Sequence, residues 1–219
     1  MHGAQELEIQ LASASPRRLE LLQLTGLEVR VTAADVDERR LRGEDPQAMT
    51  RRLALAKAKV VDSKGGLVLG ADTVVVDGTE VLGKPKDYDE AREMLESLRG
   101  RNHQVITSIA FINPDSGLDL VDTCKSNVPM RQYSDSEIEL FLANGNPLDK
   151  AGAYAIQDRS FVPADKDQMK DCFANVMGLP LCHVARNLPV AAPADVPAAC
   201  QAHTGYQCPI YSDVLEGKL

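Results

Sequence analysis

The first candidate for chemistry is a turn that reads Ser-Ala-Ser-Pro-Arg-Arg at residues 13–18. Ser15 suits the N-cap of a helix and Pro16 its first position, which places Arg17 and Arg18 in the first turn. A helix dipole disfavours cations at that end, whereas the free N–H groups there bind anions. Two interpretations stay open: a phosphate bound between the arginines and the helix end, or two solvated arginines after a capping serine.

The second candidate is Asp72, which interrupts the nearly continuous apolar run of residues 67–76. An ionised carboxylate buried without a partner would cost several kcal/mol. We therefore expect Asp72 to pair with a cation, to bind a metal ion or to lie at the mouth of a cleft. The alternative is a structural aspartate that caps a neighbouring loop, and the apolar flanks favour the functional interpretation.

Further charged residues carry weaker signals. Lys57 lies beside the apolar stripe of its predicted helix, so its ammonium either reaches the surface or points into a polar pocket. The acidic residues of segment 35–38, which ends at Glu38, could hold a hard divalent cation or form a solvated loop. Lys84 and Lys150 are expected to be exposed unless a ligand gathers them.

Several familiar catalytic signatures are absent from the sequence. Gly83-Lys84 lacks the upstream glycine of a Walker A motif and precedes a proline, and neither GxSxG nor HExxH occurs. Residues 92–96 resemble part of a Nudix box, but Lys84 and Ser97 stand where that box needs glutamates. These classes of enzyme are therefore rejected.

The composition limits the class of protein. The 219 residues suffice for one large α/β domain or two lobes around a cleft. A net charge of −8 argues against nucleic acid as a partner. The chain has no signal-like or 18-residue apolar segment, so we expect a cytoplasmic protein without a membrane partner. Its oligomeric state stays open, a homodimer included.

Alternating and helical patterns predict an α/β protein. We expect strands at 7–12, 27–32, 67–76, 104–112 and 118–131, a strand between a turn at Asp77-Gly78 and Gly83, and an extended segment at 151–157. We expect helices at 16–24, after Pro46, at 88–99, after Ser134 and after Pro180.

The helix after Pro46 is expected to bury Met49, Leu53, Ala56 and Val60, which stand at helical spacing.

The composition changes at Pro189, after which proline and alanine predominate. We therefore divide the chain into a domain at 1–188 and a loosely packed, Pro/Ala-rich C-terminal appendage at 189–219. Cys200, His203 and Cys208 are metal-capable residue types, but their spacing fits no standard zinc pattern. The five cysteines are an odd number without a CxxC pair, which disfavours a disulfide framework.

Taken together, the order and spacing of these motifs resemble the Maf family of nucleotide pyrophosphatases. The resemblance runs from about Ile9 to Leu188. The matching runs are Leu11–Arg18, Val36–Glu38, Arg52–Ala54 leading to Lys57, Gly70–Thr73, Gly83–Pro85, Asp149–Tyr154, Ile156–Gln157 and Gly178–Leu181.

The resemblance implies a mixed, twisted sheet with flanking helices, forming two lobes around a central nucleotide-binding cleft. It also implies hydrolysis of the bond between the α and β phosphates of a nucleoside triphosphate with a divalent cation, Mg²⁺ or Mn²⁺. Asp72 would be the catalytic acid–base residue and a metal ligand, and Glu38 a second metal ligand. The implied phosphate-binding residues are Ser13, Arg18, Lys57, Lys84 and Lys150.

A finer resemblance concerns the base. One subgroup, which acts on dTTP and UTP, has Arg, Thr and Gln at three base-sensing positions, which fall here on Arg17, Thr73 and Gln157. A Gln amide can pair with the donor–acceptor edge of a pyrimidine. Modified pyrimidine triphosphates would then also be substrates.

Two rival functions stay open. One is a non-catalytic nucleotide-sensing regulator of cell division, and the other a triphosphatase that releases orthophosphate.

Overall fold

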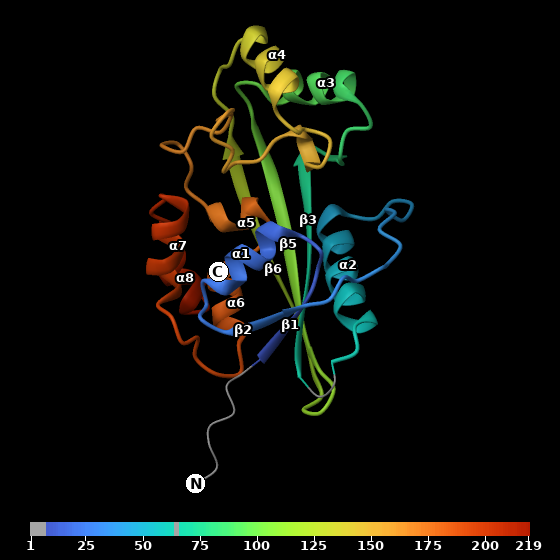
Figure 1. Cartoon of the computed structure of the whole chain (residues 1–219), viewed down its shortest axis with the longest axis vertical. Helices are drawn as coiled ribbons and strands as arrows, with labels where there is room; N and C mark the ends of the chain where they lie inside the picture. Colours follow the sequence, from blue (N-terminus) through green and yellow to red (C-terminus); the bar gives the residue numbers. More distant parts are fainter. Residues whose placement is uncertain (1–7, 64–65) are drawn as a thin grey trace.

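The computed structural model describes residues 8–63 and 66–219 and shows a mixed sheet flanked by helices (Figure 1). Leu7, the predicted start of the first strand, lies outside the described residues. The strands are β1 (Glu8–Ala12), β2 (Glu28–Val31), β3 (Leu67–Asp77), β4 (Glu80–Leu82), β5 (Asn102–Asn113) and β6 (Leu118–Pro129). Their order is β2-β1-β3-β5-β6, and β4 pairs with β3.

The sheet combines two pairing modes. β1 lies parallel to β2 and β3, whereas β3, β5 and β6 form a long antiparallel meander. β4 returns antiparallel along the far end of β3 after the tight turn at Gly78, which has a φ of +61° and so favours glycine. The predicted α/β class with a mixed sheet is confirmed.

Helices cover both faces of this sheet and one of its ends. They are α1 (Pro16–Gln23), α2 (Pro46–Val60), α3 (Tyr88–Leu98), α4 (Asp135–Asn144), the 3₁₀ turn η1 (Ala151–Ala153), α5 (Phe173–Met177), α6 (Leu181–Asn187), α7 (Val196–Thr204) and α8 (Tyr211–Leu215). α2 packs on β3 and β5. α5 packs on β5 and β6, while α3 and α4 pair at the far end of the long strands (Figure 1).

Local sequence explains where most of the helices begin. Ser15 caps α1 and Asp45 caps α2, each followed by proline at the first helical position. Ser134 and Glu137 form a capping box at the start of α4, where each side chain accepts a hydrogen bond from the other's backbone N–H. These signals can be read from the sequence, and the predicted helices there are confirmed.

The position of α2 against the sheet depends on Gly70 in β3. A Cβ atom at this residue would lie 2.2 Å from the carbonyl oxygen of Ala54 and 2.7 Å from the backbone nitrogen of Ala58. Only a residue without a side chain lets the helix backbone approach this closely. The contact brings the middle of α2 against the middle of β3.

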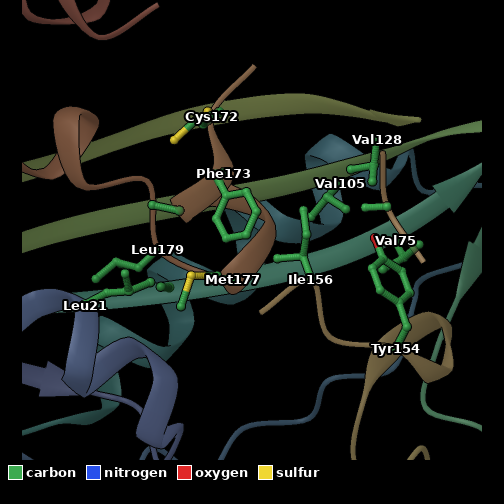
Figure 2. Packing of buried hydrophobic residues seen from close by; sticks show 14 of the residues in the cluster. Leu21, Val75, Val105, Val128, Tyr154, Ile156, Cys172, Phe173, Met177 and Leu179 are labelled. Carbon is green, nitrogen blue, oxygen red and sulfur yellow. The ribbon is translucent and has the colours of Figure 1, made fainter. Parts of the chain in front are cut away.

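The main core lies between the sheet and the helices around α5. Figure 2 shows Phe173 and Met177 of α5 within the same buried cluster as Val105 and Ile156. Phe111 and Phe173 are the largest fully buried side chains of the described residues. Leu, Val, Ile and Ala provide most of the rest of the core.

The prediction for the buried face of α2 was partly wrong. Met49 and Leu53 are buried, but Ala56 is only half-buried and Val60 is 55% exposed. The helix instead turns Ala54, Lys57 and Ala58 toward the sheet, which the close approach at Gly70 permits.

Two other local expectations also failed. The predicted extended segment 151–157 begins with the turn η1, where Gly152 has a φ of +68°. The C-terminal segment is not loosely packed, because it forms α7 and α8 and buries Val196 and Val214. Within the described residues, no helix has the length and apolarity needed to cross a membrane.

Candidate active site

A cavity of about 540 Å³ lies beside an unpaired stretch of β3, between the strands β1 and β4 that pair with the same edge. β1 pairs with β3 only as far as Gly70, and β4 begins to pair at Val75. Asp72 and Thr73 lie in the interval between these strands and line the cavity. Because β1 diverges from β3 after Gly70, the sheet is open at Asp72 and Thr73, two of the site residues predicted from the sequence.

The cavity wall brings together every site residue predicted from the sequence. Its charged and polar members include Ser13, Arg17, Arg18, Glu38, Lys57, Asp72, Thr73, Lys84, Lys150 and Gln157. They come from the turn before α1, the first turn of α1, the loop before α2, α2 itself, β3, the loop after β4 and the segment around η1. Residues spread over most of the chain thus face one space of a size typical for small-molecule sites.

Asp72 is held in a buried ion pair. Its carboxylate oxygen Oδ1 accepts a hydrogen bond from Lys57 Nζ at 2.7 Å, and the two residues are only 6% and 7% exposed. The same ammonium lies 2.6 Å from Oε1 of Glu38, whose side chain is largely exposed. One cation thus bridges a buried and an outer carboxylate at the cavity wall.

The two carboxylates differ in their ease of ionisation. Burial raises the pKa of Asp72, and the positive charges of Lys57 and Arg18 offset this effect only in part. Burial also opposes ionisation of Glu38, but Lys57, Arg18 and Lys84 outweigh it and lower the pKa of that carboxyl. A buried carboxylate with a raised pKa is suited to accept a proton.

Arg18 is anchored by the wall rather than left free. Its Nη1 donates to Ser13 Oγ at 3.2 Å, its Nη2 to Thr73 Oγ1 at 3.0 Å, and its Nε to the carbonyl oxygen of Gly178 at 3.0 Å. Burial lowers the pKa of the guanidinium, while Asp72 and Glu38 act in the opposite direction. The guanidinium therefore ties α1, β3 and the end of α5 together beside the cavity.

Thr73 lies on the opposite face of the sheet from Asp72, because successive strand residues alternate. Its hydroxyl is 3.0 Å from that of Thr107 on β5, which donates in turn to the carbonyl oxygen of Asn175. The cavity reaches both faces because, among the described residues, no strand pairs with this edge of β3 between Gly70 and Val75.

The cations at the mouth differ in their surroundings. The Lys150 ammonium pairs with Asp149 at 2.6 Å and also donates to the carbonyl oxygen of Asn146. Lys84 is exposed after β4. Both line the cavity, so a polyanion entering it would meet positive charge from two separate loops.

The apolar part of the cavity wall was not predicted from the sequence. Val176, Met177 and Gly178 at the end of α5 line the cavity, as does Tyr154 after η1. The five residues of α5 are too few for a helical period to reveal. The usable signal was Gly178 before Leu-Pro, because a φ of +113° at a helix end requires glycine.

The residues present fit a hard divalent cation. Asp72 and Glu38 supply two carboxylates that lie close together, since one oxygen of each is within 2.7 Å of the Lys57 ammonium. No group of three His, Cys, Asp or Glu side chains suited to a metal ion occurs among residues 8–63 and 66–219. Mg²⁺ is commonly held by only one or two carboxylates together with substrate phosphates and water, so two protein ligands suffice.

The family model described as Maf-like protein matches residues 8–190. The chain belongs to the Maf family. The match ends at residue 190, so that segment 189–219 lies almost wholly beyond it.

Several curated proteins similar to this Maf protein are named dTTP/UTP pyrophosphatase. The dTTP/UTP pyrophosphatase of Geotalea uraniireducens is 45% identical over 176 residues, which cover 80% of this chain and 90% of that protein. The dTTP/UTP pyrophosphatase of Chromobacterium violaceum is 44% identical over 187 residues, covering 82% and 92%. Among solved structures, a HAM1 protein from Coxiella burnetii aligns with a TM-score of 0.41 and 21% identity, covering 58% of this chain and 74% of that one.

Proposed function

We propose that this Maf protein is a nucleoside triphosphate pyrophosphatase that acts on dTTP, UTP and modified pyrimidine triphosphates. The observation that carries the proposal is the buried Asp72–Lys57 pair in the wall of a cavity lined by further cations. The names of the similar curated proteins support the same reaction. Such an enzyme would remove unwanted nucleotides from the precursor pool.

In this reaction, water attacks the α phosphorus and the bond to the oxygen bridging the α and β phosphates breaks. The nucleoside monophosphate and pyrophosphate leave, and the proton of the attacking water passes to the carboxylate of Asp72. The raised pKa of Asp72 suits it to take this proton and to release it afterwards. Lys57 holds the carboxylate oxygen in place.

The remaining polar residues of the wall would stabilise the negative charge on the phosphate oxygens. Lys84 and Lys150 approach the phosphates from two loops, and the positive end of the α1 dipole lies beside Ser13 in the cavity wall. Arg18 contributes its charge from a fixed position. A divalent cation held by Glu38 and Asp72, Mg²⁺ or Mn²⁺, would act as a Lewis acid on the phosphate oxygens.

For the base, we propose Arg17, Thr73 and Gln157 as the residues that select a pyrimidine. All three line the cavity, on the turn of α1, on β3 and after η1. The Gln157 amide offers one donor and one acceptor side, which matches the edge of uracil or thymine.

We also propose that 1–188 is the catalytic domain and 189–219 an appendage to it. The enzyme would act in the cytoplasm on free nucleotides rather than on nucleic acid, because a net charge of −8 disfavours an extended phosphate backbone.

The test is a hydrolysis panel on dTTP, UTP, CTP, 7-methyl-GTP and ATP with Mg²⁺ or Mn²⁺, in which pyrophosphate and orthophosphate are assayed separately. We expect pyrophosphate from dTTP and UTP. Asp72→Asn should lower kcat at least about 100-fold, since it removes the proton acceptor. Asp119→Asn is the matched control, because that carboxylate forms an exposed ion pair with Lys59.

Several results would contradict the proposal. Orthophosphate as the product would indicate a general triphosphatase, and full activity in Asp72→Asn would remove that residue from the reaction. Tight binding of every triphosphate without turnover would favour a nucleotide sensor. Pyrophosphate released only from triphosphates of other bases would support the pyrophosphatase reaction but contradict the proposed roles of Arg17, Thr73 and Gln157.

A further inference from the structure

A chain of hydrogen-bonding groups runs from the catalytic cavity, the 540 Å³ cavity that contains Asp72, into the core. The hydroxyl of Thr73 in the cavity wall lies 3.0 Å from the hydroxyl of Thr107 on β5. Thr107 is fully buried, and its Oγ1 lies 3.1 Å from the carbonyl oxygen of Asn175 on α5. A ligand in the cavity therefore meets Thr73, while Thr107 lies behind it.

The direction of each hydrogen bond in this chain follows from what the partners can give. A hydroxyl has one hydrogen and two lone pairs, whereas a carbonyl oxygen only accepts. The contact with Asn175 therefore uses the hydrogen of Thr107. Thr107 then has none left for Thr73, so the bond between the two hydroxyls uses the hydrogen of Thr73.

Arg18 occupies one of the two lone pairs of the Thr73 oxygen. Its Nη2 donates to Thr73 Oγ1 at 3.0 Å, and a guanidinium has hydrogens to give but no lone pair. The carbonyl oxygen of Gly178 lies 3.4 Å from Thr73 Oγ1, a longer contact that would also withhold the hydrogen of Thr73 from a ligand. Toward the cavity, Thr73 thus presents one lone pair and no hydrogen.

The carbonyl group at the end of the chain is held in place by its own residue. Asn175 is fully buried, and its side-chain Nδ2 donates to the carbonyl oxygen of Val105 on β5 at 3.0 Å and to Ser126 Oγ on β6 at 2.9 Å. Moving this carbonyl away from Thr107 would break these bonds between α5 and the sheet.

The C-terminal segment packs on the other side of α5. Tyr206 stacks on Phe173 with ring centroids 5.5 Å apart, and its hydroxyl donates to the carbonyl oxygen of Met169 at 2.8 Å. A second cavity, of about 260 Å³, lies at this contact. We call it the thiol cavity, because its wall contains Cys172, Cys182, Cys200 and Cys208 together with the two rings. α5 is therefore restrained from both sides.

We propose that Thr107 is a positioning residue that makes Thr73 a hydrogen-bond acceptor toward the base, so that the site selects an imide N–H. The inference rests on the proposed function, in which Thr73 contacts a pyrimidine. Uracil and thymine carry a hydrogen on N3, which the free lone pair of Thr73 accepts. Cytosine has a lone pair on N3, so two lone pairs would face each other and the contact would be lost.

Removing the hydroxyl of Thr107 tests this role, because it releases the hydrogen of Thr73. In Thr107→Val the side chain keeps its branched shape and loses its acceptor. The hydrogen of Thr73 can then turn toward the ligand and be donated to N3 of cytosine. Thr107→Ser keeps the hydroxyl and should retain the wild-type preference.

The first test measures kcat and KM for pyrophosphate release from UTP and from CTP. In Thr107→Val, we expect the ratio of kcat/KM for UTP to that for CTP to fall about tenfold or more. The change should lie mainly in KM, since the base contact is made equally before and during the reaction. Ser108→Ala is the matched control, because that buried hydroxyl of the same strand bonds to Thr50 and Thr123 instead.

An unchanged ratio in Thr107→Val would overturn the assignment. So would an equal fall in Thr107→Ser or in Ser108→Ala, which would indicate a general effect of altering β5. If Thr107→Val does not fold, Thr107→Ala removes the same acceptor and should shift the ratio in the same direction.

The second test measures the base preference without turnover, by calorimetric titration with UMP and CMP. The wild type should bind UMP more tightly than CMP, and Thr107→Val should lose most of this preference. A wild type that prefers UMP but releases no pyrophosphate would contradict the proposed function and still support the role of Thr107. A wild type that binds UMP and CMP equally, or neither of them, would contradict that role.

Discussion

The two cavities on either side of α5 are built on opposite electrostatic principles. The larger one contains a buried ion pair between Lys57 and Asp72 and a fixed guanidinium. The smaller one contains thiols and aromatic rings that remain neutral. A buried charge depends on its partner, whereas a neutral thiol packs like a small apolar group. The catalytic cavity should therefore be sensitive to single substitutions that the thiol cavity tolerates.

The strongest test of this contrast removes the cation at the centre of the catalytic cavity. Lys57→Met leaves Asp72 buried without its ion-pair partner, so we expect the free energy of unfolding to fall by about 3–5 kcal/mol. Urea denaturation measures this change. In the thiol cavity, Cys182→Ala should cost far less.

The double variant Lys57→Met with Asp72→Asn separates charge from packing. Removing both charges should restore a large part of the lost stability, because no uncompensated carboxylate remains. If the loss of unfolding free energy in the double variant equals the sum of the losses in the two single variants, an uncompensated charge is not the cause of the instability.

A second test moves the wall of the catalytic cavity without changing any charge. Gly70→Ala places a Cβ against backbone atoms of Ala54 and Ala58, so α2 must shift and carry Lys57 with it. We expect a loss of about 3 kcal/mol in unfolding free energy and a lower kcat. Gly83→Ala is the matched control, since a Cβ there meets nothing within 4 Å. Equal stability of the two variants would show that the close contact is unimportant.

The smallest effect concerns a buried ionisable group that has no charged hydrogen-bond partner. His103 Nε2 lies 2.7 Å from the hydroxyl of Tyr154, which lines the catalytic cavity, and burial lowers the pKa of His103 to about 4. Below pH 6.5 the unfolded chain binds a proton at His103 that the folded chain does not. Stability should therefore decline as the pH falls from 6.5 to 4.

Comparing His103→Gln with the wild type isolates this contribution. Between pH 7 and pH 5, the wild type should lose about 2 kcal/mol more unfolding free energy than the variant. Parallel pH profiles for the two proteins would show that His103 is not the group responsible.

Much of the site could be predicted because its signals are local. A carboxylate inside an apolar strand, at Asp72, and arginines in the first turn of a helix, at Arg17 and Arg18, each conflict with a purely structural role. The resemblance to the Maf family then connected residues that spacing alone left open, such as Glu38, Lys84 and Lys150. The structure places all of these around one cavity.

The remaining features could not be predicted, because they depend on contacts between distant segments. Val60 matches the apolar period of α2 yet is exposed, since the helix rotates to fit against Gly70. The helix α5 is too short to show a period. The packing of Tyr206 on Phe173 is likewise invisible in the Pro/Ala-rich composition of the C-terminal segment.

The sequence by itself determined where many of the helices and turns begin and which residue types could do chemistry. Caps, alternation and turn residues act over a few positions, so Ser15, Asp45 and Gly78 specify their helices and turn locally. Only the tertiary structure decided how charges and aromatic rings are paired. Lys57 meets Asp72 because a glycine admits the helix, and Phe173 meets Tyr206 because the C-terminal segment folds back onto α5. Such pairings depend on packing between segments, which no local pattern records.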